Sequence, residues 1–365
     1  MNMDNTINIF CNFLNRLNTS TIFIMKKSKW ILLTGLVINS FFAQSQSVDK
    51  IKFFAEEGII EMTLTTDIPK MQKEKGEEVF QPATASLKFP DNTVIAEPIT
   101  VAPRGHFRRE YCDVPPILIA FKSATSPRLS PLGKLKLVIG CGSRGNDEQL
   151  LIKEYLIYKM YNLLDEKSFR VRLLKVNFVD TRNKVKPYSQ YAFLIEDDKD
   201  MAARNNCIRK PGAKYQTEST NRDQMTKVGV FEYMISNGDW SVPANHNTKL
   251  IFDKNNESAL PFVVPYDFDH SGFVNASYAT PNELLGTESV TERVYRGFPR
   301  EEAELQVIMD FYRSKKEAIT SLINNCTYLL PKIKKEAIDY LNDFYKTISD
   351  KKEVRRIFKD NARTK

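Results

Sequence analysis

The order of strand-like and helix-like segments is the feature that most restricts how this chain can fold. Short apolar segments bounded by turn residues predict strands at 51–54, 59–65, 85–89, 99–101, 116–121, 134–139, 170–179 and 191–195. One long helix is expected at 148–164, and helical spacing returns at 301–325 and 331–348. Strands followed by helices predict an α+β fold of two lobes: a β-rich region at 46–196, a helical region at 197–349 and a charged tail at 350–365 that frays.

The first 45 residues have the composition of a leader that is removed from the mature protein. A basic segment precedes an apolar run at 30–42, and small residues follow at 43–45, as in a secretory signal. Translation is therefore expected to start at Met25, and an N-terminal extension is the alternative interpretation of residues 1–24. No other apolar run approaches the ~18 residues of a membrane helix. We expect an exported protein (periplasmic, cell-surface or secreted) with no membrane span after signal removal.

The charge of the mature chain is mildly basic. Without residues 1–45, the 53 basic and 45 acidic residues become 49 and 44, which leaves a net charge of +5. This excess suits an acidic or phosphorylated ligand. The sequence has no basic stripe interleaved with aromatic residues, so we expect no nucleic-acid partner.

Four cysteines remain after removal of the leader, an even number in a compartment that permits disulfides. Their spacing fits no zinc pattern. We predict that Cys112 pairs with Cys141, because both terminate neighbouring predicted strands, and that Cys207 pairs with Cys326. Buried free thiols are the alternative.

Two polar segments on either side of a short hydrophobic hairpin carry the most suggestive chemistry. The first holds Asp239 in a glycine-containing turn and, eight residues later, Asn247. The second holds Asp267 and Asp269, which bracket Phe268 so that both carboxylates point the same way in an extended backbone. Together they could hold a metal and a phosphate. Asp239 could instead cap a turn, and a calcium loop lacks its twelve-residue ligand spacing.

A lysine and a glutamate upstream could complete such a site. Glu154 falls in the middle of the apolar stripe of the helix at 148–164, and a buried carboxylate needs a cation. Lys136, on the preceding strand, could reach both Glu154 and a nucleotide phosphate. The alternative is that Glu154 extends outward at the boundary between the lobes and Lys136 is solvated.

Two further segments suit phosphate or nucleotide. Arg104 and Arg108 lie beside a glycine, where guanidinium groups can meet phosphate oxygens, although a surface charge run is the alternative. Residues 140–145 match G-x-G-x-x-G between a strand and a helix. The acidic residue expected ~20 positions later is missing, so we interpret them as a glycine-rich connection.

Residues 104–279 resemble the secreted atypical protein kinases of the spore-coat CotH type, and more distantly the secretory-pathway kinases that share their fold. The resemblance rests on Arg104-Gly105, the helix with Glu154, the strand 191–195 ending at Glu196, Asn237-Gly238-Asp239-Trp240, and Asp267-Phe268-Asp269 before Gly272. It implies a two-lobed protein-kinase-like fold with a β-rich N-terminal lobe and a mainly helical C-terminal lobe.

The resemblance also implies an activity, cofactors and roles. Asp239 would be the catalytic carboxylate, Asp267 and Asn247 metal ligands with Asp269 beside them, and Glu196 the start of a hinge that contacts adenine. Lys136, Glu154, Arg104 and Arg108 would serve the nucleotide. The expected activity is phosphoryl transfer from ATP with Mg²⁺ or Mn²⁺ to a protein Ser/Thr hydroxyl, with residues 273–300 docking the substrate.

Two other functions stay open at this point. CotH-type loops have Arg after the catalytic Asp, whereas this chain has Trp240, which favours a catalytically inactive kinase-like binding module. A kinase acting on a sugar or a lipid head group is the second alternative. The sequence does not identify the acceptor, the partner protein or the oligomeric state.

Overall fold

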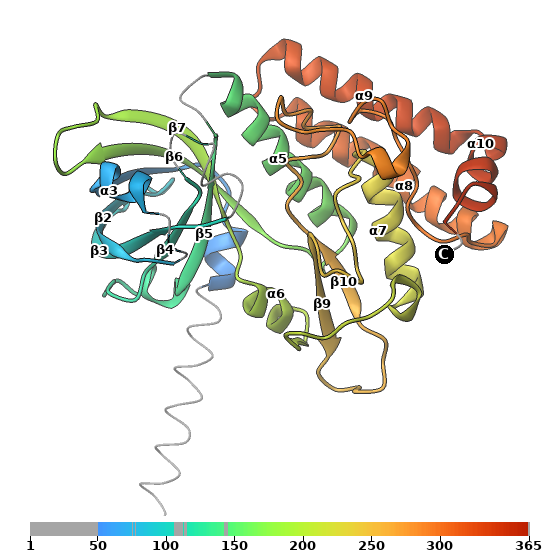
Figure 1. Cartoon of the computed structure of the whole chain (residues 1–365), viewed down its shortest axis with the longest axis horizontal. Helices are drawn as coiled ribbons and strands as arrows, with labels where there is room; N and C mark the ends of the chain where they lie inside the picture. Colours follow the sequence, from blue (N-terminus) through green and yellow to red (C-terminus); the bar gives the residue numbers. More distant parts are fainter. Residues whose placement is uncertain are drawn as a thin grey trace, which may run out of the picture. The chain divides into compact units, whose positions relative to one another are not determined.

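The computed structural model describes residues 50–74, 76, 78–105, 112, 115–141 and 145–363. Residues 51–365 form one compact unit (Figure 1). The predicted signal and start site lie outside the described residues. Across the described ranges, none of the helices combines the length and apolar character needed to cross a membrane.

Seven strands form a closed barrel (Figure 1). Their order around it is β1 (Ile60–Thr66), β2 (Gln81–Lys88), β3 (Val94–Pro103), β4 (Ile117–Ala120), β5 (Lys134–Ile139), β7 (Tyr188–Ile195) and β6 (Val171–Asp180). Neighbours are antiparallel, except that β1 pairs with β6 in parallel, with Ile60 opposite Leu174. Inward-facing side chains such as Leu64, Leu87 and Val176 are fully buried and share one core.

The closed barrel contradicts the predicted two-lobed protein-kinase-like fold with a β-sheet N-terminal lobe. The predicted strands were mostly right, and β5 has the predicted bounds. What the sequence did not reveal is the parallel pairing of β1 with β6, which joins segments more than a hundred residues apart and leaves no local signature. Closure also removes the free edges that an open sheet would expose. The strand predicted at 51–54 was wrong, because those residues are helical.

Helices and a small sheet make up most of the rest of the compact unit. The helices are α3 (Ile68–Lys73), α5 (Gly145–Leu164), α6 (Asp198–Arg204), α7 (Arg222–Met234), α8 (Glu302–Asn324), α9 (Pro331–Ser349) and α10 (Lys351–Arg355). The sheet has the order β10 (Phe262–Pro265), β9 (Thr248–Asp253), β8 (Cys207–Arg209). Short 3₁₀ turns occur at Ser130–Leu132, Thr217–Ser219 and Glu283–Leu285, and a π-helical turn at Arg356–Asp360.

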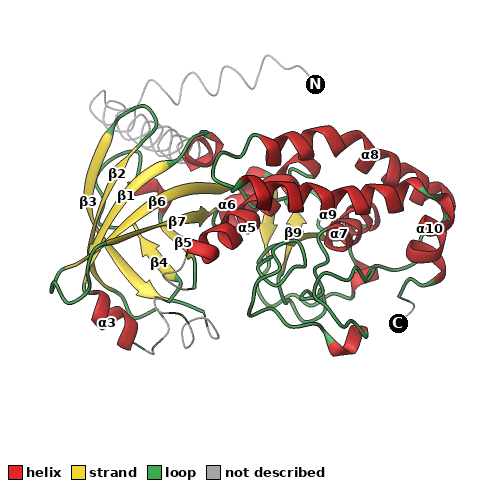
Figure 2. Ribbon diagram, turned by 90° about the horizontal axis from the view of Figure 1, so that it is seen from above, coloured by secondary structure: helices red, strands yellow, loops and turns green. Residues whose placement is uncertain are grey.

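Helix α5 connects the barrel to the helical part. It packs against β6 and β7 and also against α8, and α8 and α9 run side by side (Figure 2). Its Tyr158 and Tyr161 are buried and meet the rings of Phe268 and Phe231, with centroids 4.8 Å and 4.6 Å apart. This aromatic cluster fixes α5 against the loop that contains the predicted metal ligands.

The charged C-terminal segment does not fray as predicted. It continues as α10 and the π-helical turn, and Phe358 is fully buried. The Phe358 ring lies 5.0 Å from that of Tyr233 and 4.7 Å from that of Tyr295. A single aromatic side chain therefore anchors a segment whose composition suggested a free tail.

One of the two predicted disulfides is present. Cys112 and Cys141 are bonded, which confirms the first pairing. Cys207 is a buried free thiol on β8 and Cys326 a free thiol just after α8, so the second pairing was wrong. An even number of cysteines permits pairing, but only the fold decides which thiols meet.

Candidate functional site

Most of the predicted site residues line one cavity of about 190 Å³, here called the barrel-side cavity. The barrel contributes residues from β5 and β7 and the segment after β3, and the loops around β9 and β10 contribute the acidic residues. Its lining comprises Arg104, Gly105, Pro116, Lys136, Val138, Tyr158, Ile195, Asp239, His246, Asn247, Tyr266, Asp267, Asp269 and His270. Segments separated by more than a hundred residues thus meet at one place.

Asp239 is held by three neighbours. Its backbone N–H donates to Asn237 Oδ1 at 3.0 Å, and its Oδ1 lies 2.8 Å from His246 Nε2. Asn247 Nδ2 donates to Asp239 Oδ2 at 3.0 Å and to its carbonyl oxygen at 2.8 Å. The Asp239 side chain is still 41% exposed. The carboxylate is therefore fixed in direction and remains accessible to a ligand.

Asn247 has an unused acceptor. The residue is buried, its backbone has a positive φ of 50°, and its Nδ2 is committed to Asp239. Its Oδ1 accepts no hydrogen bond from any residue that the structure describes. Because Asn247 lines the cavity, this amide oxygen can serve as a ligand for an ion or a substrate group.

The Asp267–Asp269 turn is built on a buried phenylalanine. Phe268 is fully buried, whereas Asp267 and Asp269 both line the cavity, although the backbone at Asp267 is left-handed and not extended as predicted. Asp267 adopts a φ of 64°, and its N–H donates to Tyr158 Oη at 2.9 Å. Tyr278 Oη donates to Asp269 Oδ2 at 3.0 Å. The turn is thus fixed from α5 and from the following segment.

Lys136 supplies a cation that is only partly stabilised by its surroundings. Burial, together with the nearby positive charges of Arg104 and Lys249, lowers the pKa of Lys136 to about 8, and Asp267 opposes the change. Its Nζ lies 5.4 Å from the ring centroid of Tyr266. A group that is costly to charge in the free protein is suited to meet an anionic ligand.

The predicted ion pair between Lys136 and Glu154 is not formed among the described residues. The carboxylates that act on Lys136 are Asp267 and Asp198, and Glu154 is not one of them. Glu154 is buried and lines a different, much smaller cavity beside Asp269. Glu154 is buried on the helix as predicted, but Lys136 lies near Asp267 and not near Glu154.

Glu196 does not line this cavity, contrary to the prediction. The Glu196 carboxylate accepts hydrogen bonds from Nε and Nη2 of Arg204, at 3.0 Å each, and from the backbone N–H of Arg170 at 3.0 Å. Its neighbour Ile195 lines the cavity instead. Arg108 lies outside the described residues, whereas Arg104 lines the cavity as expected.

Sequence reasoning missed two functional-site residues that the geometry brings in. Tyr158 holds the Asp267 backbone from α5, and it lies one helical turn after Glu154, so the spacing could have revealed it. Tyr266 lies below both Lys136 and Lys249, whose Nζ atoms are 5.4 Å and 4.9 Å from its ring centroid. No local pattern indicated that contact.

The loop that carries Asp239 rests on buried polar groups. Arg296 donates to the carbonyl oxygens of Gly238 and Trp240, both at 2.6 Å, and its guanidinium carbon lies 5.2 Å from the Trp240 ring centroid. Glu232 lies beneath the same loop, and burial raises its pKa to about 8, which the nearby Asn237 side chain and Arg296 oppose. Trp240 is therefore buried, and Arg296, from a later part of the chain, holds the loop around it.

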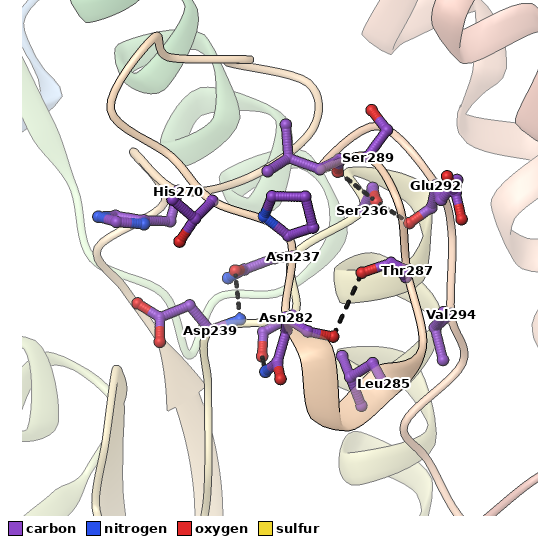
Figure 3. Close-up of a pocket in the computed structure, with 14 residues that line it drawn as sticks. Ser236, Asn237, Asp239, His270, Asn282, Leu285, Thr287, Ser289, Glu292 and Val294 are labelled. Atoms are coloured by element: carbon purple, nitrogen blue, oxygen red, sulfur yellow. Dashed lines mark hydrogen bonds between the residues drawn. The ribbon is translucent and has the colours of Figure 1, made fainter.

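A second cavity adjoins the first. It measures about 270 Å³, and we call it the loop-side cavity. Figure 3 shows Asp239 and His270 at one end and Leu285, Thr287 and Val294 at the other. Asp239 and His270 line both cavities. The complete lining is Ser236, Asn237, Gly238, Asp239, His270, Thr280, Pro281, Asn282, Leu285, Thr287, Ser289, Val290, Glu292 and Val294.

The donor set of the barrel-side cavity was tested for a metal. In the described part of the chain, no three His, Cys, Asp or Glu side chains are placed to hold an ion by themselves. Asn247, Asp267 and Asp269 nevertheless provide oxygen atoms around one cavity. Mg²⁺ typically takes one or two carboxylates and completes its shell with water and substrate phosphates. The residues fit a metal that arrives with a polyphosphate.

No protein-family model matches this chain, and no curated protein matches it. The resemblance to CotH-type kinases therefore stays a prediction, and the functional argument depends on the geometry of the site.

Proposed function

We propose that this protein is an exported phosphotransferase that uses ATP with Mg²⁺ or Mn²⁺. The observation that carries the proposal is the composition of the barrel-side cavity, in which Lys136 and Arg104 face Asp239, Asn247 and Asp267. Cations beside oxygen donors are what a metal-bound polyphosphate requires. The likeness to CotH-type kinases belongs to the proposal and concerns these motifs, from which a protein Ser/Thr acceptor is the first expectation.

Each residue has a defined task in this scheme. Lys136 and Arg104 attract the phosphates, and the aromatic ring of Tyr266 limits water around Lys136. Asn247, Asp267 and Asp269 would hold the divalent ion, which when bound supplies charge neutralisation and orientation of the phosphates. Asp239 accepts the proton of the acceptor hydroxyl, and His246 and Asn247 keep its carboxylate in place.

A catalytically inactive binding module is the main competing function. It was suggested by Trp240 in place of an arginine. Arg296 weakens that argument, because its guanidinium contacts the same loop and donates to the carbonyls on both sides of Asp239. The loop is braced by an arginine despite the substitution, so we retain the enzymatic function.

The test uses nucleotide binding and covalent products together. The purified mature protein is titrated with ATP and Mn²⁺ while its thermal unfolding is followed, and intact-mass spectrometry detects phosphate or AMP adducts. We expect ATP to raise the melting temperature only with the metal present. Asp267→Asn should lose most of this effect, whereas Asp343→Asn, an exposed position on α9, should keep it. Equal binding by both variants, or no binding by the wild type, would refute the proposal.

A further inference from the structure

We infer that the loop-side cavity is the acceptor site of this enzyme and that it takes a neutral, hydroxyl-rich group of the size of one sugar residue. The inference rests on the proposed phosphotransferase function and names its substrate class. Its starting point is that Asp239 and His270 line both cavities. Figure 3 shows the Asp239 carboxylate at the edge of the loop-side cavity. A hydroxyl held in this cavity would thus meet Asp239 beside phosphates bound in the barrel-side cavity.

Charge separates the two cavities. The barrel-side cavity contains Lys136 and Arg104, whereas the described lining of the loop-side cavity contains no lysine or arginine. Its acidic residues are Asp239 and Glu292. An anionic ligand, such as a lipid head group with phosphate, would meet the like charges of Asp239 and Glu292 there, with no lysine or arginine of the described lining to offset them. The composition selects an acceptor without negative charge.

The lining combines polar groups with an apolar wall. Hydroxyl and amide side chains come from Ser236, Thr280, Asn282, Thr287 and Ser289, and apolar surface comes from Pro281, Leu285, Val290 and Val294. A few fixed polar groups among apolar ones is the usual composition of a small-molecule site. A sugar ring presents hydroxyl groups at its rim and C–H groups on its faces, so it matches both kinds of lining.

The walls are held in place by hydrogen bonds between separate segments. Ser236 Oγ donates to the carbonyls of Val290 at 2.9 Å and Glu292 at 2.5 Å. Thr287 Oγ1 donates to the Asn282 carbonyl at 3.4 Å. Gly272 packs so closely that an added Cβ would lie 2.3 Å from the Val290 carbonyl oxygen. The cavity is thus pre-formed, which lowers the cost of ordering a small ligand.

Size and shape favour a sugar over a peptide. The volume of about 270 Å³ lies just below the ~300–1,000 Å³ of sites for drug-sized ligands. An extended peptide is usually recognised along a sheet edge or groove, where its backbone hydrogen bonds are met. This cavity is instead lined by side chains of one compact turn and the Asp239 loop. Nine of its fourteen lining residues fall within residues 273–300, the segment expected to dock the substrate.

The transfer balances with groups named above. The acceptor oxygen forms a bond to the γ-phosphorus of ATP, and the bond from that phosphorus to the bridging oxygen of the β-phosphate breaks. ADP leaves with those electrons, and the hydroxyl proton passes to Asp239 and then to water. The products are ADP and a phosphorylated sugar.

The first experiment measures sugar binding without nucleotide. Saturation-transfer NMR is recorded with glucose, mannose, galactose, N-acetylglucosamine and their methyl glycosides, and with glucose 6-phosphate as the anionic probe. We expect at least one neutral sugar to bind and the phosphate ester not to compete. Thr280→Trp, at an exposed rim position, and Asn282→Leu should each weaken binding about tenfold, ~1.4 kcal/mol. Leu284 lies on the same turn but outside the lining and is 96% exposed, so Leu284→Trp should leave sugar binding unchanged.

The second experiment separates this inference from the proposed function. ATP, Mn²⁺ and either the neutral sugars or a Ser/Thr-rich peptide mixture are supplied, and ADP and the phosphorylated product are measured. A sugar phosphate that is lost in Thr280→Trp supports the inference. Phosphopeptide without sugar phosphate, unaffected by Thr280→Trp, overturns the inference and leaves the proposed function standing. Sugar binding without any ATP binding would leave a sugar-binding cavity and remove its role as an acceptor site.

Discussion

Replacing Lys136 by methionine should make the free protein more stable while it weakens nucleotide binding. Methionine has a similar length and no charge, so it removes the desolvation cost of a buried ammonium without leaving a large void. A pKa that falls from 10.5 to about 8 corresponds to about 3 kcal/mol, at ~1.4 kcal/mol for each pH unit. We therefore expect Lys136→Met to raise the free energy of unfolding at pH 7 by up to about 3 kcal/mol.

The pH dependence gives this prediction its sign. Between about pH 8 and 10.5, the unfolded chain keeps the Lys136 proton and the folded chain has released it. Because the unfolded state then binds more protons, the wild type gains stability as the pH rises, and the variant does not share that gain. The difference between them should fall from about 3 kcal/mol at pH 7 to about 1 kcal/mol at pH 9.5.

Urea unfolding followed by tryptophan fluorescence or circular dichroism measures the effect across that pH range. Lys134→Met is the matched control, since Lys134 lies on the same strand two residues earlier and its side chain is 54% exposed. We expect its effect to stay within about 0.5 kcal/mol. A less stable Lys136→Met protein, or a gain that does not change with pH, would refute the argument that Lys136 is held against its preferred charge state.

The same variant links stability to function. A phosphate beside Lys136 restores the charge that burial disfavours, and a hydrogen bond to a charged group is worth about 1.5–3 kcal/mol. Lys136→Met should therefore bind ATP with Mn²⁺ roughly ten- to hundredfold more weakly in isothermal titration calorimetry. In the wild type, ATP binding above pH 8 should take up a proton, which calorimetry in buffers of different ionisation enthalpy detects.

Two further perturbations test the surroundings of the site. Cys112→Ser and Cys141→Ser should each lower the free energy of unfolding by about 3–4 kcal/mol, because the disulfide spans 29 residues. The double variant should be no less stable than either single variant. Urea unfolding measures the effect, and Cys326→Ser, at a free thiol, is the control. Burial raises the pKa of Glu232 to about 8, so between pH 4.5 and pH 8 the folded state keeps a proton that the unfolded state has lost. Glu232→Gln should therefore stabilise the protein increasingly over that pH range, by at most about 5 kcal/mol. A stability difference that stays constant over that pH range would show that Glu232 is ionised in the fold.

The sequence predicted the parts that local patterns encode. The strand at 134–139, the helix ending at Leu164 and the loops with Asp239 and Asp267 were all visible, because alternation, helical spacing and turn residues act over a few positions. Lys136, Asn247 and Asp267 do line one cavity, as the resemblance to CotH-type kinases implied. Whether these residues perform the roles expected of them is a matter for the experiments above.

The parts that depend on distant pairing could not be read in this way. Barrel closure requires β1 to pair in parallel with β6, and no local sequence pattern near residue 60 indicates that pairing. The partner of Lys136 was misassigned for the same reason, because a strand lysine can face either a helix or a loop until the tertiary packing is known. The free Cys207 and Cys326 show that the number of cysteines restricts pairings without selecting among them.

Several unfavourable local states occur in and beside the two cavities. Ser236, Asn247 and Asp267 have positive φ angles of 52°, 50° and 64° in the loops that form them, and each such non-glycine residue costs of order 1–3 kcal/mol. Burial displaces the pKa of Lys136 downward and that of Glu232 upward, both to about 8, so each of these groups also opposes folding near neutral pH. Strain of this kind persists when the surrounding fold over-determines it, and displaced pKa values cluster at functional sites. A purely structural loop would gain stability by losing these features, so their presence supports the proposal that these loops form a functional site.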